Sequence, residues 1–274
     1  MQVRLARKVL MVFVGACSSF GMISSQASIK KSSLLYHDPL LGPRVGLKSE
    51  WVGHRPLSRS THFLIMAGHA DSQGIAGAGT AGEAVALKGK SPMDPSISDE
   101  LFWNLLLRDA IVQAGRDKGL HITGYEPGIR NLDDGNHPNT NWSVGAQHVK
   151  NGGYALEIHF DSYGEYGFGS GLIPAISTKL NLVDESLAYY FGRYPLFFRG
   201  GLGAPKRGIR ILEIGKLEGN LEDNLRNANS REKVLKSISN RIIDAIILGT
   251  QSSNIENINP QLNKDDIAHP VSHH

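Results

Sequence analysis

Residues 62–71 read HFLIMAGHAD, and they give the clearest indication of both the type of sheet and the place of a functional site. A short apolar run that ends in glycine is typical of a buried strand followed by a tight turn. His69 stands just beyond this run, with Asp71 close behind it. In open parallel sheets, ligands bind beyond the carboxyl ends of the strands. The stretch therefore predicts a buried strand whose end carries a candidate site residue, His69.

The rest of the chain alternates strand patterns with helix patterns. Further strands are expected at 120–127, 154–160 and 209–215, and helices at 98–119, 142–152, 182–193 and 231–249. Such alternation favours a mostly parallel sheet that is covered on both faces. We therefore expect an α/β fold with a single domain over 61–250, in which helices flank both faces of a mostly parallel twisted sheet. Residues 71–98, rich in Gly, Ala, Ser and Pro, are expected to form a long loop.

The composition is that of a globular protein. The chain has 274 residues, of which 41% are hydrophobic and 20% charged, and a formal net charge of +3. No dense Lys/Arg block lies in the body of the chain, so nucleic acid is not expected as a partner. A mildly basic chain suits contact with an anionic cell wall or membrane surface.

The first residues have the pattern of a secretory signal peptide, which we expect over 1–27. A basic start is followed by an apolar stretch and then by small residues. One alternative is an uncleaved membrane anchor. Another is a lipid-anchored form, because VGAC resembles a lipobox ending at Cys17. The protein is thus expected to be exported, periplasmic or cell-envelope associated, with membrane attachment through this segment only. Residues 28–60 are expected to be a linker or irregular lead-in, and 251–274 a polar, disordered tail.

Four polar side chains stand at element ends or inside apolar strands, where an unpaired charge is costly: His69, Glu100, His159 and Glu213. Each also has a purely structural interpretation. The first histidine can be a turn histidine bonded to the backbone, and the second a hydrogen-bonded core histidine. Glu100 can simply favour the positive end of a helix dipole. Glu213 can pair with Arg210 or Lys216, although a buried carboxylate needs such a partner or a raised pKa.

Together these residues suit hydrolytic zinc chemistry. Catalytic zinc takes three protein ligands, and two histidines with one glutamate meet that requirement while leaving a position for water. The metal lowers the pKa of its water to about 7 and polarises a carbonyl. Glu213, as a nearby carboxylate outside the ligand set, can take a proton from water and pass it to a leaving nitrogen. The only cysteine, Cys17, lies in the leader, so thiolate ligands are not expected.

Short motifs of other hydrolases are absent. The chain has no HExxH, CxxC or GxSxG motif, so a serine hydrolase is poorly supported. Four longer segments instead carry a family resemblance: MAGHADSQGIAGAGT at 66–80, ELFWNL at 100–105, EIHFD at 157–161 and ILEIGKLEGNLEDNL at 211–225. Each resembles a motif of one enzyme family, in the same order along the chain. The first resembles an AGHGG-D-GA-G loop, and the second a Glu that starts a helix and is followed by Asn four residues on. The third resembles a SIHAN strand and the fourth a LVEIGFLSN strand. That family is the zinc-dependent N-acetylmuramoyl-L-alanine amidases of catalytic type 3, and the resemblance spans about 62–248.

The resemblance implies a function and a set of roles. It implies a zinc-dependent hydrolase of the amide between N-acetylmuramic acid and L-alanine, with peptidoglycan or a muropeptide as substrate. It implies that His69, Glu100 and His159 hold Zn²⁺ and that Glu213 is the catalytic general base and then acid. Two alternatives remain: a zinc hydrolase of a different amide or peptide on the same scaffold, and a non-catalytic module that binds wall fragments.

The chain departs from the family pattern at several positions. The loop between the first two expected ligands is longer than usual, so Glu83 is a rival ligand. Asp161 stands where the family has Asn, and it either orients His159 or a bound water or is a solvated loop residue. Asn104 matches the family's Asn and is a candidate for contact with a ligand or with substrate. Arg130 matches an Arg of the family, with structural pairing or contact with a substrate carboxylate as its alternative roles.

Overall fold

The computed structural model describes residues 36–46, 53, 55–176 and 178–251. The expected signal peptide, the lipidation position Cys17 and the expected tail beyond 251 lie outside the described residues. Among the residues that are described, no helix combines the length and the apolarity that a membrane crossing needs.

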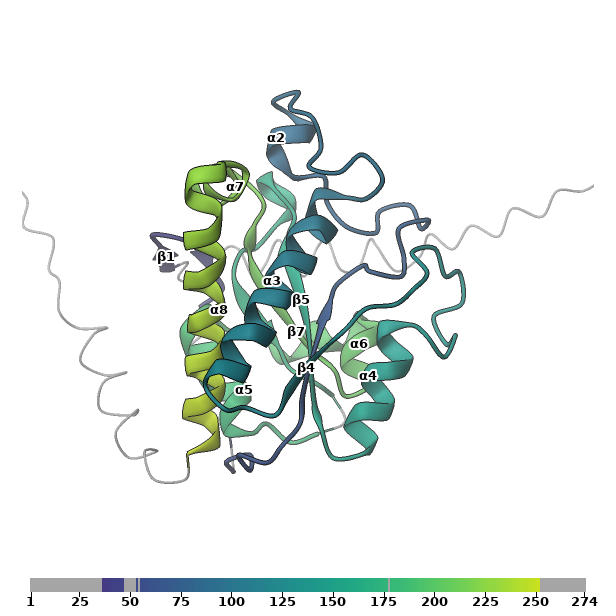
Figure 1. The fold of residues 1–274 in the computed structure, drawn as a ribbon, viewed down its shortest axis with the longest axis vertical. Helices are drawn as coiled ribbons and strands as arrows, with labels where there is room; N and C mark the ends of the chain where they lie inside the picture. The colour runs from purple at the N-terminus through teal and green to yellow at the C-terminus, as the bar shows by residue number, and fades with distance from the viewer. Residues whose placement is uncertain (1–35, 47–52, 54, 177, 252–274) are drawn as a thin grey trace, which may run out of the picture. The chain divides into compact units, whose positions relative to one another are not determined.

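A five-stranded sheet forms the centre of the fold (Figure 1). Its strand order is β4-β3-β5-β7-β6, in which β6 is antiparallel to β7 and the other neighbours are parallel. The strands are β3 (Phe63–Ala67), β4 (Ile122–Tyr125), β5 (Tyr154–Asp161), β6 (Gly171–Ile173) and β7 (Arg210–Lys216). A separate two-stranded sheet pairs β1 (Tyr36–Asp38) with β2 (Gly42–Arg44). The expected α/β fold with a mostly parallel sheet is confirmed.

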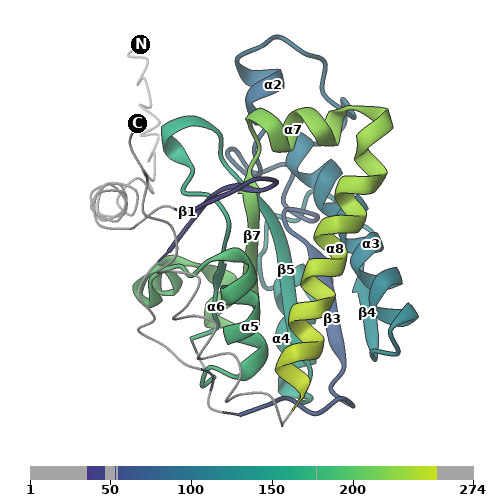
Figure 2. The same ribbon diagram turned by 90° about the vertical axis from the view of Figure 1, so that its left-hand side faces the viewer.

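Helices cover both faces of this sheet (Figure 2). One face carries α3 (Asp99–Asp117), α5 (Leu182–Phe191), α7 (Gly219–Arg226) and α8 (Ala228–Thr250), and the other carries α4 (Asn141–Lys150) and α6 (Gly203–Lys206). Side chains alternate accordingly along β3, since Phe63 and Ile65 belong to the core under α3 and α8 whereas Leu64 and Met66 belong to the core under α4. Burial of both strand faces explains the continuous apolar runs in the sequence.

Local signals set the start and the end of α3. The Ser98 side chain caps the helix by accepting a hydrogen bond from the backbone N–H of Leu101, and Asp99 and Glu100 lie in the first turn. Gly119 follows the helix with φ of 74°, a left-handed conformation that glycine adopts without strain. The cap fixes the first turn, and with it the carboxylate of Glu100, at one edge of the sheet.

Several elements have no counterpart in the sequence-based expectation. Within the expected lead-in, the described residues include β1 and β2, and the expected loop at 71–98 contains a short helix, α2 (Gly82–Ala86). Strand β6, helices α6 and α7 and the 3-10 turns η1 (Gly164–Tyr166) and η2 (Leu196–Gly201) were also not expected. All of them are short, so periodicity gives little signal for them.

Candidate active site

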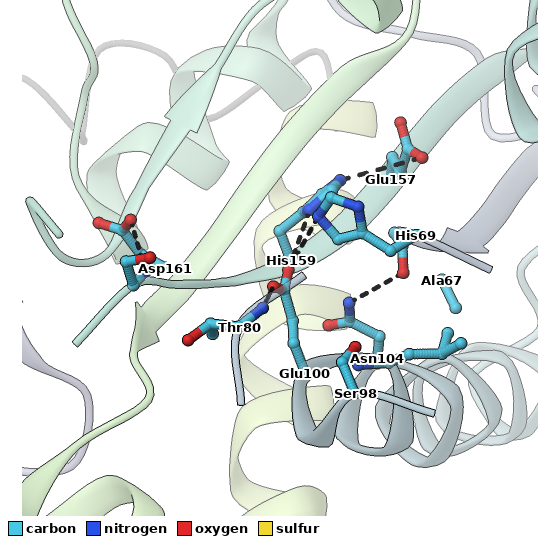
Figure 3. Close-up of polar contacts among 12 residues, drawn as sticks. Ala67, His69, Thr80, Ser98, Glu100, Asn104, Glu157, His159 and Asp161 are labelled. Atoms are coloured by element: carbon cyan, nitrogen blue, oxygen red, sulfur yellow. Dashed lines mark hydrogen bonds and ion pairs between the residues drawn. The ribbon is translucent and has the colours of Figure 1, made fainter. Parts of the chain in front are cut away.

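Three side chains that were expected to act together converge at the carboxyl ends of β3 and β5 (Figure 3). His69 follows β3, His159 lies on β5, and Glu100 reaches them from the first turn of α3. Glu100 Oε1 lies 3.4 Å from His69 Nε2 and 3.2 Å from His159 Nδ1. The two imidazole rings are nearly perpendicular, with centroids 4.8 Å apart. One carboxylate oxygen therefore faces one nitrogen of each histidine.

The backbone before His69 is shaped to bring the two histidines together. His69 has φ of 62°, the single positive φ of a non-glycine residue in the described part of the chain. At Gly68, a Cβ atom would lie 2.3 Å from Cε1 of His159, so only glycine leaves room for that ring. The Gly68 carbonyl accepts a hydrogen bond of 3.2 Å from Asn104 Nδ2, and its N–H donates to the Ile158 carbonyl. The turn is thus tied to both α3 and β5.

Glu100 is buried and held from a second side. Its side chain is 4% exposed, and its Oε2 accepts a hydrogen bond of 2.8 Å from the backbone N–H of Thr80. Burial raises the pKa of Glu100, but the charges of His69 and His159 outweigh this and lower the pKa below its ordinary value. The carboxylate form is therefore favoured, which is the form a metal ligand needs.

His159 lies between two buried carboxylates. Its Nδ1 faces Glu100, and its Nε2 lies 3.9 Å from Oε1 of Glu157, a residue 4% exposed on the same side of β5. Burial lowers the pKa of His159, but the hydrogen bond to Glu100 and the nearby carboxylate of Glu157 outweigh it and raise the pKa well above its ordinary value. The two carboxylates therefore favour a positive charge at this position, supplied either by a proton on the imidazole or by a metal ion that replaces that proton.

Glu213 lies beside His159 on the neighbouring strand. The register of β5 and β7 pairs the two residues directly, and the buried Oε2 of Glu213 has no hydrogen-bond partner among the described residues. Burial, with only partial relief from His159, raises the pKa of Glu213 to about 8. Both cations considered as its partners are engaged elsewhere, since Arg210 Nε donates to Asp184 over 2.9 Å and Lys216 pairs with Glu218. The structure therefore does not show the pairing of Glu213 with Arg210 or Lys216 that the sequence left open.

The three converging side chains suit a metal ion. In the described residues, one group of His, Cys, Asp or Glu side chains has donor atoms close enough to share an ion, and it consists of His69, Glu100 and His159 with donors within 4.8 Å of one another. Two imidazole nitrogens and one carboxylate oxygen form a donor set typical of catalytic zinc. The residues present therefore fit the metal that the sequence predicts.

Other expected site residues lie apart from this group. Glu83, the rival ligand, is on α2, where it pairs with Lys88 at 2.8 Å and accepts a hydrogen bond from the N–H of Gly219. Arg130 bonds the Ala70 carbonyl at 3.1 Å and pairs with Glu126, so it braces the turn after His69. The structure therefore places Glu83 outside the metal group and gives Arg130 the structural pairing.

Asp161 does not contact His159. Its carboxylate instead accepts hydrogen bonds from the backbone N–H groups of Ser162, Phe168 and Gly169, and it points away from the histidines (Figure 3). A register shift between β5 and β7 separates His159 from Asp161 and accounts for this direction. Asp161 therefore holds the 162–169 loop in place and does not orient His159.

Two residues at the site were missed in the sequence. Glu157 was visible as a charged residue inside an apolar strand, two positions before His159 and thus on the same side of β5. Asn141, the first residue of α4, donates from Nδ2 to the Ala67 carbonyl over 2.7 Å and to Glu157 Oε1 over 3.1 Å. No local pattern marks Asn141, because its partners lie far away in the sequence.

Comparison with known proteins gave matches among solved structures only. No family model matches the chain, and no curated protein matches it. Cwp6 from Clostridium difficile is similar over 71% of this chain at 12% identity with a TM-score of 0.49, and the chain spans 30% of that protein. The N-acetylmuramyl-L-alanine amidase Ami1 from Mycobacterium smegmatis is similar over 71% of this chain and 100% of its own, at 14% identity with a TM-score of 0.42.

A third similar structure is the catalytic domain of CwlV, an N-acetylmuramoyl-L-alanine amidase from Bacillus (Paenibacillus) polymyxa var. colistinus. The similarity covers 74% of this chain and 99% of that domain, at 12% identity with a TM-score of 0.41. Solved structures similar to this chain thus include N-acetylmuramoyl-L-alanine amidases, the family that its sequence motifs resemble, at low sequence identity.

Proposed function

We propose that this protein is a zinc-dependent N-acetylmuramoyl-L-alanine amidase that hydrolyses the amide between N-acetylmuramic acid and L-alanine in peptidoglycan. The observation that carries the proposal is the convergence of His69, Glu100 and His159 beside Glu213, whose buried Oε2 has no partner among the described residues. The similar solved structures have TM-scores below 0.5, so the proposal rests on the residues of the site and on the sequence motifs.

In this proposal, three side chains hold the metal and a fourth moves the proton. His69, Glu100 and His159 supply the ligands, and the Thr80 N–H holds the second oxygen of Glu100 away from the ligand position. A bound zinc ion polarises a carbonyl and lowers the pKa of water at its open position. The metal-binding side chains thus form one wall of the reaction site, at the carboxyl edge of the sheet.

Glu213 acts as general base and then as general acid. It takes a proton from the attacking water as the new C–O bond forms, and it delivers that proton to the amide nitrogen as the C–N bond breaks. The products are the lactyl carboxylate of the sugar and a peptide with a free N-terminal L-alanine. The pKa of about 8 belongs to the chain without a cation. A positive ion nearby stabilises the ionised carboxylate of Glu213 and so lowers the pKa of this group towards neutral pH.

Metal content and product analysis together test the proposal. The purified protein should contain about one zinc per chain after reconstitution, and digestion of purified peptidoglycan should release peptides with free N-terminal L-alanine, detected by mass spectrometry. Zinc without this cleavage would favour a hydrolase of a different amide or peptide. A chain that takes up no zinc at neutral pH and cleaves nothing would favour a wall-fragment binding module and would overturn the proposal.

Export is part of the same proposal. Peptidoglycan lies outside the cytoplasmic membrane, and the first 27 residues have the signal-peptide pattern described above. We infer a periplasmic or envelope location, in which the N-terminal segment is the part of the chain that would contact a membrane. Fractionation of cells expressing the full chain, with mass determination of the mature N-terminus, distinguishes cleavage after Ala27 from lipidation at Cys17.

A further inference from the structure

Glu157 is a buried carboxylate to which the proposed mechanism gives no role. It is 4% exposed and lies in the middle of β5, between strands β3 and β7. A carboxylate in such a place is costly unless it is paired. Among the described cationic side chains, the one that approaches it is the imidazole of His159, whose Nε2 lies 3.9 Å from Glu157 Oε1. The cost of burying Glu157 therefore points to a role in contact with His159.

The two nitrogens of His159 face different carboxylates. Nδ1 is directed to Glu100 Oε1, at 3.2 Å, on the side where the ligand atoms converge, and Nε2 is directed to Glu157 (Figure 3). An imidazole that gives one nitrogen to a metal keeps its proton on the other nitrogen, and that N–H needs an acceptor. Glu157 is the carboxylate on that side, 3.9 Å away, so it is the group placed to accept this proton.

Glu157 is itself held by α4, the helix that covers the face of the sheet on which its side chain lies. Asn141 Nδ2 donates to Glu157 Oε1 over 3.1 Å and to the Ala67 carbonyl over 2.7 Å. Asn141 is the first residue of α4, where the positive end of the helix dipole favours a nearby carboxylate. The carboxylate thus has a fixed position that depends on α4 and β3 as well as on its own strand, which is what an orienting group requires.

We propose that Glu157 is a positioning residue that pairs with the Nε2–H of His159, directs Nδ1 to the zinc ion and raises the affinity of the site for zinc. This inference rests on the proposed zinc site. It also distinguishes the chain from the motif it resembles, because EIHFD has Glu157 where the SIHAN pattern has Ser. Zinc with one carboxylate ligand keeps a net positive charge, and a second buried carboxylate beside the histidine neutralises it.

The test measures zinc affinity without using activity. Zinc dissociation constants of the purified protein are obtained by competition with a chromophoric chelator, for wild type, Glu157→Gln, Glu157→Ser and Glu157→Asp. Glu83→Gln is the matched control, because it removes a carboxylate from a pair outside the metal group. The melting temperature of each zinc-free variant reports whether the fold is kept. Removing the orienting carboxylate should weaken zinc binding by about 10–100-fold in E157Q and E157S, with partial recovery in E157D.

The possible outcomes separate the positioning role of Glu157 from the proposed amidase function. Weaker zinc binding in E157Q and E157S, with unchanged binding in E83Q and an unchanged zinc-free melting temperature, supports it. Wild-type affinity in both variants overturns it and leaves the proposed amidase function standing. Weaker binding that follows a fall in the zinc-free melting temperature, with E157D no better than E157S, shows a structural role and also overturns it. A wild-type chain that binds no zinc overturns the proposed function, and this inference with it.

Discussion

His159 and Glu213 lie directly opposite each other on the parallel strands β5 and β7. Neighbouring residues in register point to the same side of a sheet, so the two side chains are adjacent at the edge where His69 also lies. His159 is engaged by two carboxylates, whereas the buried Oε2 of Glu213 has no partner among the described residues. His159 is therefore suited to be a metal ligand, and Glu213, with an oxygen left free, is suited to be the general base.

Glu213→Gln tests this division. The change keeps the shape of the side chain but removes the group that accepts a proton, so the rate of amide cleavage should fall by about 10²–10⁴-fold. The zinc content should stay at the wild-type level because Glu213 is outside the ligand group. Release of muropeptide products is followed by mass spectrometry at matched zinc occupancy, with Glu83→Gln as control. Wild-type turnover in E213Q would rule out the assigned role.

Gly68→Ala should disturb His159 without removing any ligand. The added Cβ lies 2.3 Å from the imidazole, so the ring must move, and such overpacking typically costs about 1–3 kcal/mol. We expect weaker zinc binding and a lower melting temperature. Gly128→Ala is the matched control, since a Cβ at Gly128 meets no atom within 4 Å. If G68A binds zinc like the control, then the close approach of this turn to His159 has no functional consequence.

His69→Asn separates the strain at this position from the imidazole. Asn is among the residues enriched at positive φ, so the variant should keep the turn whose φ is 62° and should fold with a zinc-free melting temperature near that of wild type. Zinc at 100 times the dissociation constant should stabilise wild type by about 2.7 kcal/mol. The variant has lost a ligand and should show little of this gain. Thermal melts with and without zinc measure it, and an equal zinc-induced rise in H69N would exclude His69 as a ligand.

The parts of the site that could be predicted from the sequence depend on local signals. The apolar run before Gly68 marks the end of β3, and Ser98 marks the start of α3, so the places of His69 and Glu100 could be expected. Parallel strands bring their carboxyl ends to one edge, which gathers His159 and Glu213 there as well. For His69 and Glu100, the pattern of a few neighbouring residues was enough.

The parts that could not be predicted depend on packing between distant segments. Asp161 was expected near His159, but the register shift between β5 and β7 turns it to the 162–169 loop. The position of Glu157 relative to His159 depends on how α4 presents Asn141. The segment 71–98 was expected to be a long loop, yet it contains α2, and backbone bonds such as Glu83 N–H to the Leu217 carbonyl fix part of it near β7 and α7. None of these contacts leaves a periodic trace in the sequence.

Glu222 gives a prediction about stability and pH that is independent of the metal. It is fully buried on α7, where Oε2 accepts a hydrogen bond of 2.9 Å from the Ala84 N–H and Oε1 has no partner among the described residues. Burial, opposed by the bond from Ala84, raises the pKa of Glu222 from 4.5 to about 7. The folded chain therefore binds more protons than the unfolded chain between these values, and Glu222 lowers the free energy of unfolding as pH rises through them.

Glu222→Gln should remove this dependence. The amide cannot ionise, so the variant should melt above wild type at pH 8, by roughly 2–4 °C for each kcal/mol recovered, and the gap should narrow as pH falls towards 5. The exposed Asp223→Asn on the same helix is the control and should run parallel to wild type. Melting temperatures of wild type and both variants at pH 5, 6.5 and 8 in zinc-free buffer measure the gap. A constant gap between E222Q and wild type across this range would mean that Glu222 stays ionised in the folded protein, held by the Ala84 N–H and by the charge of Arg226.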